Sequence, residues 1–394
     1  MLDEQLANAL HARERRGTRR RLGAAPPGAD FSSNDYLGIA RSAEARAGVR
    51  ERLSAGCHVG STGSRLLDGD SPTHARTEAR LAHHFGAPCA LLFNSGFDAN
   101  VSLFTTLPQP GDLVVYDALI HASVHDGMRA SRATCVPFAH NSTADLDHVL
   151  ARELAGARGA ATRSGRLNVF LAIEGVYSMD GDHAPIHALA AVLARHVPCA
   201  DARALIVDEA HSVGVYGKGG RGYCAALGAT DLARVRLVTF GKAFGCAGAA
   251  VLCTPLVRDY LLNYARPLVY STALAPLSVA AINAVLDMAA SGALDARART
   301  LHARTHALRT ALHEWALPPA PPGLPPPPII PLLTPHALEL AAHLQRSGCI
   351  ARAVRYPTVA RGTERVRICV HAHNTDADIA RLVDALRAWR PAHL

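Results

Sequence analysis

Short apolar runs that stop abruptly at polar residues recur along this chain. Residues 204–207 are followed directly by Asp208, and residues 235–238 are followed directly by Thr239. Runs of this length that are rich in β-branched residues are typical of buried strands in a parallel sheet. Open α/β sheets bind their ligands at the carboxyl ends of the strands. We therefore expect the polar residues after these two runs to share one site.

The same pattern predicts elements over most of the sequence. Further strands are predicted at residues 90–93, 112–116, 168–173, 249–253, 329–333 and 365–370. Helical spacing predicts an amphipathic arm over 2–22 and helices that end near 50, cover 73–85, start at 270–272, cover 279–290, end near 315 and cover 336–347. The proline-rich residues 317–328 predict a stiff loop, with a partner ligand as the alternative. We divide this α/β chain into an N-terminal arm (1–45), a large domain (46–280) and a small α+β domain (281–394).

One glycine-containing segment is a candidate for binding phosphate. The strand at 90–93 leads into Ser95-Gly96-Phe97, where the next helix is expected to begin. A helix start offers unpaired N–H groups and a positive dipole end, which suit a phosphate group. Ordinary capping by Ser95 would explain the same residues. The earlier glycine-rich stretch at 60–70 matches neither the Walker nor the Rossmann spacing.

Asp208 and Lys242 suggest a specific chemistry. An Asp, a His, a Thr and a Lys at one sheet edge suit a pyridoxal phosphate pocket, in which the lysine forms a Schiff base and a carboxylate keeps the ring nitrogen protonated. Taken singly, an Asp that ends a strand is more often a cap or turn residue, and a Gly-Lys pair is commoner in loops. The motifs around Asp208 and Lys242 decide between a cofactor site and these ordinary structural roles.

Four motifs, in this order, resemble those of the α-oxoamine synthases, a family of fold-type I pyridoxal phosphate enzymes. They are FSSNDYLG at 31–38, EGVYSMDGD at 174–182, DEAH at 208–211 and TFGKAFG at 239–245. The resemblance runs from about Phe31 to the C-terminus. It implies a mostly parallel central sheet with helices on both faces and a smaller α+β C-terminal domain.

The segments FAHN at 138–141 and GAAVL at 248–252 look more like the biotin-synthesis branch than like glycine C-acetyltransferase, 5-aminolevulinate synthase or serine palmitoyltransferase. This likeness implies an acyltransferase that joins a small amino acid, L-alanine, to an acyl-CoA, pimeloyl-CoA, with loss of carbon dioxide. The sequence leaves three alternatives open: a different acyl-CoA substrate, glycine or serine as the amino acid, or a non-catalytic partner subunit of the same fold. Such subunits tend to lose the lysine that this chain keeps as Lys242. An aminotransferase would need no acyl-CoA.

The resemblance also implies roles around the cofactor ring. Lys242 would hold the cofactor and act as general base, and Asp208 would contact the pyridine nitrogen. His121 would stack on the ring, His211 would bind its 3-oxygen, and Ser178 would lie at its phenolic edge. The residues implied to hold the cofactor phosphate are Gly96, Phe97, Thr239 and, from the partner subunit of a homodimer with shared active sites, Thr272. The residues implied to bind substrate are Arg19, Asn34, Thr358 and Arg367.

The assignment of Arg19 depends on its distance from the FSSNDYLG motif. The family usually has a small β-hairpin between the basic arm and this motif, whereas here only nine residues separate Arg21 from Phe31. The register of the arm is therefore open. For Arg367, the planar guanidinium suits bidentate binding of the amino-acid carboxylate.

Net charge and cysteine content limit the binding partners, disulfides and metal sites that this chain can be expected to have. The formal net charge is +8, but the arginines are scattered and no basic stripe with interleaved aromatic residues is present, which argues against nucleic-acid binding. We expect the positive charge to line the entrance of the active site, where it would attract an anionic acyl-CoA. Nine cysteines, an odd number without a Cys-x-x-Cys pair, disfavour a disulfide framework or a zinc site and imply a reducing compartment.

Two signals concern location. No apolar run approaches the roughly 20 residues that span a bilayer, and the first residues lack the apolar core of a secretory signal. We therefore expect a cytoplasmic protein. The C-terminal Ala392-His393-Leu394 is a relaxed version of the Ser-Lys-Leu peroxisomal address, which would matter in a eukaryotic source.

Overall fold

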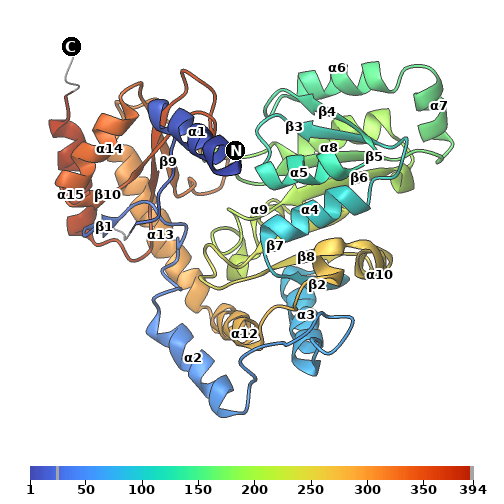
Figure 1. Ribbon diagram of the computed structural model, residues 1–394, viewed down its shortest axis with the longest axis horizontal. Helices are drawn as coiled ribbons and strands as arrows, with labels where there is room; N and C mark the ends of the chain where they lie inside the picture. The colour runs from blue at the N-terminus through green and yellow to red at the C-terminus, as the bar shows by residue number, and fades with distance from the viewer. Residues whose placement is uncertain (24–25, 391–394) are drawn as a thin grey trace.

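A seven-stranded sheet forms the centre of the larger lobe (Figure 1). The computed structural model describes residues 1–23 and 26–390. In spatial order the strands are β2 (Cys89–Phe93), β8 (Ala249–Cys253), β7 (Val235–Thr239), β6 (Arg203–Asp208), β5 (Val169–Glu174), β3 (Leu113–Asp117) and β4 (Thr134–Phe138). Each strand predicted in this lobe is confirmed to within about one residue. Only β4 lacked a prediction.

The sheet is mostly parallel, as predicted. The exception is β8, which pairs antiparallel with both β7 and β2. The loop from β7 to β8 covers only residues 240–248. A parallel connection needs a crossover of about a dozen residues or more, so a loop this short permits only an antiparallel return. The loop carries Lys242 across the carboxyl end of β7.

Each face of the sheet has its own hydrophobic core. Alternate residues point to opposite faces, so that Val114 packs in one core and its neighbours Leu113 and Val115 pack in the other. Helices α4 (Gly96–Thr106), α5 (Ala122–Ala130) and α10 (Pro255–Tyr264) cover one face. Helices α3 (Pro72–Phe85), α6 (Thr143–Glu153), α8 (Ile186–His196) and α12 (Pro276–Ala290) cover the other. This arrangement confirms the predicted helices on both faces.

The smaller lobe contains the three-stranded antiparallel sheet β11-β12-β9. Its strands are β9 (Ile329–Leu333), β11 (Arg352–Val354) and β12 (Arg365–Cys369), and its helices are α14 (Ala337–Arg346) and α15 (Asp376–Ala388). Helix α13 (Ala293–Ala311) leads into it from the larger lobe (Figure 1). The N-terminal segment joins this lobe, because β1 (Ala29–Asp30) pairs in parallel with β10 (Cys349–Ile350). This pairing brings the FSSNDYLG motif, which follows β1, beside the small lobe.

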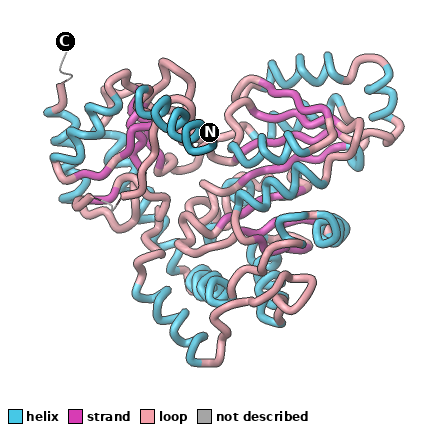
Figure 2. Tube along the Cα trace, in the orientation of Figure 1, coloured by secondary structure: helices cyan, strands magenta, loops and turns pink. Residues whose placement is uncertain are grey.

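The remaining helices are short or peripheral (Figure 2). They are α1 (Leu2–Arg15), α2 (Ala43–Ser54), α7 (Ala157–Arg163), α9 (Tyr223–Ala226), α11 (Arg266–Val269) and the 3₁₀ turns Ala200–Ala202, Lys218–Gly220 and Thr230–Leu232. The helices expected to end near 50 and near 315 end at Ser54 and Ala311. Two other predicted boundaries are wrong. The arm helix stops at Arg15 rather than 22, just before Gly17 adopts a φ of 61°. The helix predicted to start at 270–272 starts at Pro276 instead, since proline is favoured in the first turn.

The proline-rich residues 318–328 form neither helix nor strand, as predicted. The carbonyl oxygen of Pro325 accepts a hydrogen bond from Tyr216, so this segment packs against the larger lobe. Among the described residues, no single helix has the length and apolar character needed to cross a membrane. Taken together, α12 and α13 are long and apolar enough to cross a membrane by length and composition only, but a bend of 78° separates them. The predicted domain boundaries stay a prediction, and the one at 280 falls inside α12.

Candidate active site

Lys242 is positioned by the loop that follows β7. The aromatic rings of Phe240 and Phe244 on either side of it are buried and anchor the loop. The Lys242 Nζ lies 2.8 Å from His211 Nε2. Burial lowers the pKa of Lys242 to about 8, although the carboxylates of Asp208 and Glu174 act in the opposite direction. This amine therefore loses its proton more readily than an ordinary lysine, as a nucleophile or base requires.

Asp208 ends β6 and is held by two donors. Its Oδ1 accepts from the Ala210 N–H at 2.9 Å, and its Oδ2 accepts from Asn100 Nδ2 at 2.8 Å. Asn100 also donates to Ser123 Oγ, which lies 2.7 Å from Nδ1 of His121. Asp208 and His121 are thus linked through residues of α4 and α5. His121 caps α5 and is solvent-exposed, which suits a ring that stacks on a bound ligand.

The segments proposed for phosphate binding come together at the start of α4. Ser95 caps this helix through the Asp98 N–H, and Gly96 is its first residue. A Cβ atom at Gly96 would lie 3.4 Å from the Thr239 Cβ, so the helix start and the end of β7 are in close contact. Thr272 lies in the same region of this chain, because its carbonyl accepts from Asn94 Nδ2 at 2.9 Å.

The two lobes meet at a second polar cluster. Arg367 on β12 donates through Nη2 to Asn34 Oδ1 at 2.9 Å and to the Tyr36 hydroxyl at 3.2 Å. The Tyr36 hydroxyl lies 2.8 Å from Nδ1 of His211, whose other ring nitrogen faces Lys242. The Arg367 Nε is buried and has no partner among the described residues. A free guanidinium donor beside the amine is well placed to bind a carboxylate.

Other predicted residues are not joined to this cluster. Arg19 pairs with Glu14 at 3.2 Å on the arm, and Thr358 is exposed, with its N–H bonded to the Arg355 carbonyl. Within residues 1–23 and 26–390, no hydrogen bond or ion pair links Arg19 or Thr358 to Lys242 or Arg367. Ser178 is half-buried in the loop after β5, and Phe97 is 46% exposed at the start of α4.

Three residues of the cluster had no predicted role. Tyr36 stands inside the FSSNDYLG motif, but nothing local shows that its hydroxyl reaches His211. Asn100 follows the Ser95 cap on α4, and its contact with Asp208 spans 108 residues. Glu174 lies opposite Asp208 in the sheet register, and burial followed by the charge of Asp208 raises its pKa well above the ordinary value. Its sequence signals were the strand end and its place as the first residue of the EGVYSMDGD motif.

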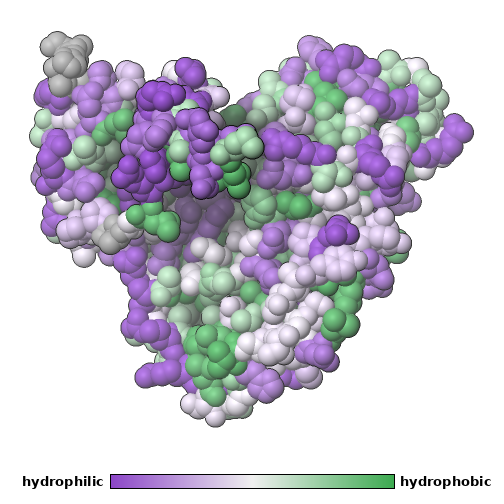
Figure 3. All heavy atoms as spheres, viewed as in Figure 1, coloured by the Kyte–Doolittle hydropathy of each residue, from purple (hydrophilic) through white to green (hydrophobic). Residues whose placement is uncertain are grey.

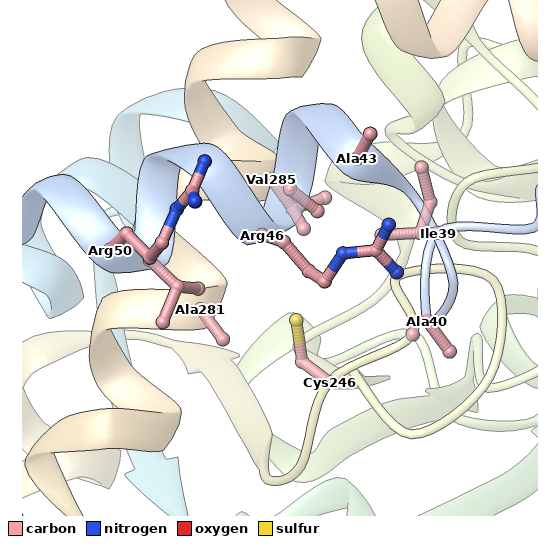
Figure 4. Close-up of a pocket in the computed structure, with 11 residues that line it drawn as sticks. Ile39, Ala40, Ala43, Arg46, Arg50, Cys246, Ala281 and Val285 are labelled. Atoms are coloured by element: carbon pink, nitrogen blue, oxygen red, sulfur yellow. The ribbon is translucent and has the colours of Figure 1, made fainter.

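A separate cavity of about 540 Å³ is bordered by the last part of the Lys242 loop (Figure 4). Helices α2 and α12 form two of its walls, and Gly245 and Cys246 form part of a third. The side chains of Arg46 and Arg50 project from α2 beside it. None of its lining residues belongs to the Lys242 cluster.

The sequence and the fold were compared with known proteins. The pattern of the aminotransferase class I and II family matches residues 26–386. An 8-amino-7-oxononanoate synthase of Emericella nidulans is 41% identical over 98% of this chain and 96% of its own length. This chain belongs to the aminotransferase class I and II family. Within this family its similarity extends over nearly its full length to the 8-amino-7-oxononanoate synthases.

Solved structures of the aminotransferase class I and II family have the same fold. A serine palmitoyltransferase from S. paucimobilis with bound PLP-myriocin has a TM-score of 0.82 at 26% identity, covering 98% of this chain and 97% of that one. The 8-amino-7-oxononanoate synthase of Francisella tularensis has a TM-score of 0.73 at 26% identity, covering 91% and 96%. The fold-type I architecture expected from the motifs is therefore confirmed.

The residues present fit pyridoxal phosphate, the cofactor of this family. The buried Lys242 amine has a lowered pKa and lies in the field of two carboxylates. Asp208 keeps its carboxyl oxygens directed by N–H donors. The contact between Gly96 and Thr239 brings a helix start and a hydroxyl together, as a phosphate requires. The unpartnered Arg367 Nε adds a donor for the substrate.

Proposed function

We propose that this enzyme condenses L-alanine with pimeloyl-CoA and forms 8-amino-7-oxononanoate, coenzyme A and carbon dioxide, a step of biotin biosynthesis. The observation that carries the proposal is the chain of contacts from the buried Lys242 amine through His211 and Tyr36 to Arg367, whose Nε has no partner among the described residues. The full-length similarity to 8-amino-7-oxononanoate synthases supports the choice of substrates.

Each residue of the cluster has a defined task in this reaction. Pyridoxal phosphate would supply an electron sink for the substrate Cα when bound, and the residues that would hold it are Lys242, Asp208, His121, His211, Ser178, Gly96, Phe97 and Thr239. Arg367 and Asn34 bind the carboxylate of alanine. Lys242 Nζ takes the Cα proton as general base, which its pKa of about 8 permits. Tyr36 holds the His211 ring through Nδ1, so that Nε2 faces the amine.

The bonds and protons balance as follows. The Cα–H bond of alanine breaks and its proton passes to Lys242 Nζ. A carbon–carbon bond forms between Cα and the thioester carbonyl carbon, and the carbon–sulfur bond breaks. The coenzyme A thiolate leaves and takes a proton. The alanine carboxylate departs as carbon dioxide, and the protonated Lys242 returns a proton to Cα.

A substrate panel tests the proposal. Purified holoenzyme is incubated with L-alanine, glycine or L-serine and with acyl-CoA thioesters that include pimeloyl-CoA and palmitoyl-CoA, and the product masses are recorded. We expect L-alanine and pimeloyl-CoA to give the highest kcat/KM, at least about tenfold above other pairs, which is ~1.4 kcal/mol. Preference for serine with palmitoyl-CoA would assign a different α-oxoamine synthase. Absence of every condensation product would favour a non-catalytic subunit or an aminotransferase.

We also propose a homodimer with shared active sites. Large apolar side chains are exposed on two segments of the larger lobe: Leu67 in the glycine-rich loop is 78% exposed and Tyr270, next to Ser271 and Thr272, is 73% exposed. The space-filling view shows apolar residues at the surface of this lobe (Figure 3). Surfaces of this kind mark association sites, and two-fold dimers are the commonest soluble oligomers.

Light scattering measures this association. We expect a mass of twice 41.6 kDa at assay concentration. Leu67→Asp should shift the mass toward the monomer and lower activity, whereas Leu333→Asp, at a 50% exposed position of β9 in the small lobe, should leave the dimer intact. A fully active wild-type monomer would contradict shared sites.

For location we propose the cytoplasm, with the peroxisome as the alternative in a eukaryotic source. The C-terminal tripeptide at 392–394 lies outside the described residues. A fluorescent fusion that leaves the C-terminus free, expressed in a eukaryotic host, distinguishes the two. Diffuse fluorescence would exclude the peroxisomal address.

A further inference from the structure

The FAHN segment follows β4 and places His140 between two carboxylates. The His140 Nδ1 lies 2.8 Å from Asp117 Oδ1, and its Nε2 lies 2.7 Å from Asp182 Oδ2. The same oxygens accept from other N–H groups, Oδ1 of Asp117 from Leu119 N and Oδ2 of Asp182 from Asn141 Nδ2. Both oxygens therefore act as acceptors. Both ring nitrogens of His140 must then donate, which makes the ring an imidazolium.

The two carboxylates belong to the two loops that carry residues assigned to the cofactor ring. Asp117 ends β3, four residues before His121. Asp182 lies in the loop after β5, four residues after Ser178. The Tyr177 ring of this second loop packs edge-on against His140 at 4.4 Å between centroids. His140 thus contacts both loops directly.

Asn141 strengthens the same junction. Its backbone N–H donates to Asp117 Oδ2 at 2.8 Å, and its side chain donates to Asp182 Oδ2 at 2.8 Å. The residue has a φ of 54°, a left-handed conformation that asparagine tolerates better than most residues. The turn at 140–141 is therefore shaped so that two consecutive residues reach both carboxylates.

We propose that His140 is a positioning residue, whose imidazolium ties the His121 loop to the Ser178 loop and sets the distance between them. The inference rests on the proposed function, because it concerns the same active site. The charge is part of the role. Asp117 is fully buried, and a buried carboxylate without a cationic partner is strongly destabilising.

The protonation of His140 follows from its neighbours. Burial lowers its pKa, but the hydrogen bonds and charges of Asp117 and Asp182 outweigh burial and raise the pKa to about 10. The groups that face the ring are Asp117 from β3, and Asp182 and Tyr177 from the loop after β5. Burial raises the pKa of Tyr177 well above its ordinary value, so its hydroxyl stays neutral. The ring should therefore remain charged from pH 6 to pH 9.

The first test uses holoenzyme variants His140→Gln and Asp182→Asn. Misplacing a catalytic group by about 1 Å can cost about 10²-fold in rate, so we expect kcat to fall between about tenfold and 10²-fold. The KM for L-alanine should change less than about twofold, since Arg367 and Asn34 lie outside the two loops, and the cofactor absorbance band should shift. His196→Gln is the matched control: His196 pairs with Asp147 at 2.6 Å, away from both loops, and its loss should change none of these quantities. A folded His140→Gln variant with wild-type kcat and absorbance would overturn the proposal.

The second test measures the protonation state of His140 and needs no activity assay. In ¹⁵N-histidine-labelled protein, the His140 signals, assigned by their loss in His140→Gln, should show two protonated nitrogens at pH 8. Asp182→Asn, which keeps the ring but removes one charge, should move the titration to lower pH. A neutral His140 ring at pH 8 would overturn the proposal even if condensation is observed. If no acyl-CoA is condensed but the ring is charged and the absorbance shifts in the variants, the proposed function fails and the positioning role stands.

The pH dependence of the stability of the fold is an independent test of the charge on His140. A histidine with a folded pKa of about 10, against 6.5 in the unfolded chain, stabilises the fold fully below about pH 6.5 and loses this contribution as the pH rises through 10. The difference in Tm between wild type and His140→Gln should therefore shrink from pH 6.5 to 10. A difference that stays constant over this range would contradict a charged clamp.

Discussion

Lys242→Ala should abolish condensation, with kcat lowered at least about 10³-fold, which is ~4 kcal/mol of transition-state stabilisation. By the proposed function, the variant loses both the amine that would hold the cofactor and the base that would take the Cα proton. No neighbouring group can replace it, because His211, whose Nε2 contacts the amine, has a pKa that burial lowers well below its ordinary value. Product formation from L-alanine and pimeloyl-CoA, measured by mass spectrometry, gives the rate.

The composition of the chain supplies an internal control for this experiment. Only two of its 41 Lys and Arg residues are lysines, Lys218 and Lys242. Lys218 is exposed on a 3₁₀ turn, so Lys218→Ala should keep full activity. Borohydride reduction of the holoenzyme should attach the cofactor to the peptide that contains Lys242 and leave the Lys218 peptide unmodified. More than a trace of condensation by Lys242→Ala would refute the assignment.

Asp208→Asn should lower kcat by about 10³-fold, ~4 kcal/mol, while the fold is retained. An amide has nearly the same shape as the carboxylate, but it carries no charge with which to hold a pyridine nitrogen in its protonated form. The two donors that now direct the carboxylate, Ala210 N–H and Asn100 Nδ2, set its orientation only. Single-turnover rates of Cα proton exchange in deuterium oxide report this step directly.

Two variants separate charge from position at Asp208. Asn100→Ala removes one orienting hydrogen bond and keeps the charge, so we expect a loss of only about tenfold. Asp231→Asn, at an exposed position, should have no effect. If Asp208→Asn exchanges the Cα proton at the wild-type rate, the carboxylate does not act on the cofactor nitrogen.

Local signals account for much of what could be predicted. The strands that end at Thr239, Asp208 and Glu174 were recognisable because β-branched apolar runs stop at a polar residue, and the resemblance of the motifs placed Lys242 and Arg367 in one site. The helix predicted over 73–85 is confirmed as α3, which Ser71 caps and Pro72 begins. The end of the arm helix at Arg15 was missed, since Gly17 breaks a helix through its own conformation and the leucine spacing does not show this.

The roles of individual residues were also predicted only in part. The clusters at Arg367 and at Lys242 have the predicted members Asn34 and His211, but Tyr36, which joins the two clusters, had no assigned role. The structure leaves Arg19 and Thr358 in contacts of their own on the arm and on the small lobe. Their part in substrate binding therefore stays a prediction.

By itself, the sequence determined which residue types stand at the ends of the strands and hence the chemistry available to this enzyme. Such information is local, because burial of a strand and capping of a helix depend on neighbours a few residues away. Only the tertiary structure decided which of these residues meet. The contacts of Tyr36 with His211, of Asn100 with Asp208 and of His140 with Asp182 span 175, 108 and 42 residues. The last two exist because parallel strands bring distant loops to one edge of the sheet. The pairing of β1 with β10 does the same for the two ends of the chain, so that Asn34 meets Arg367 across 333 residues.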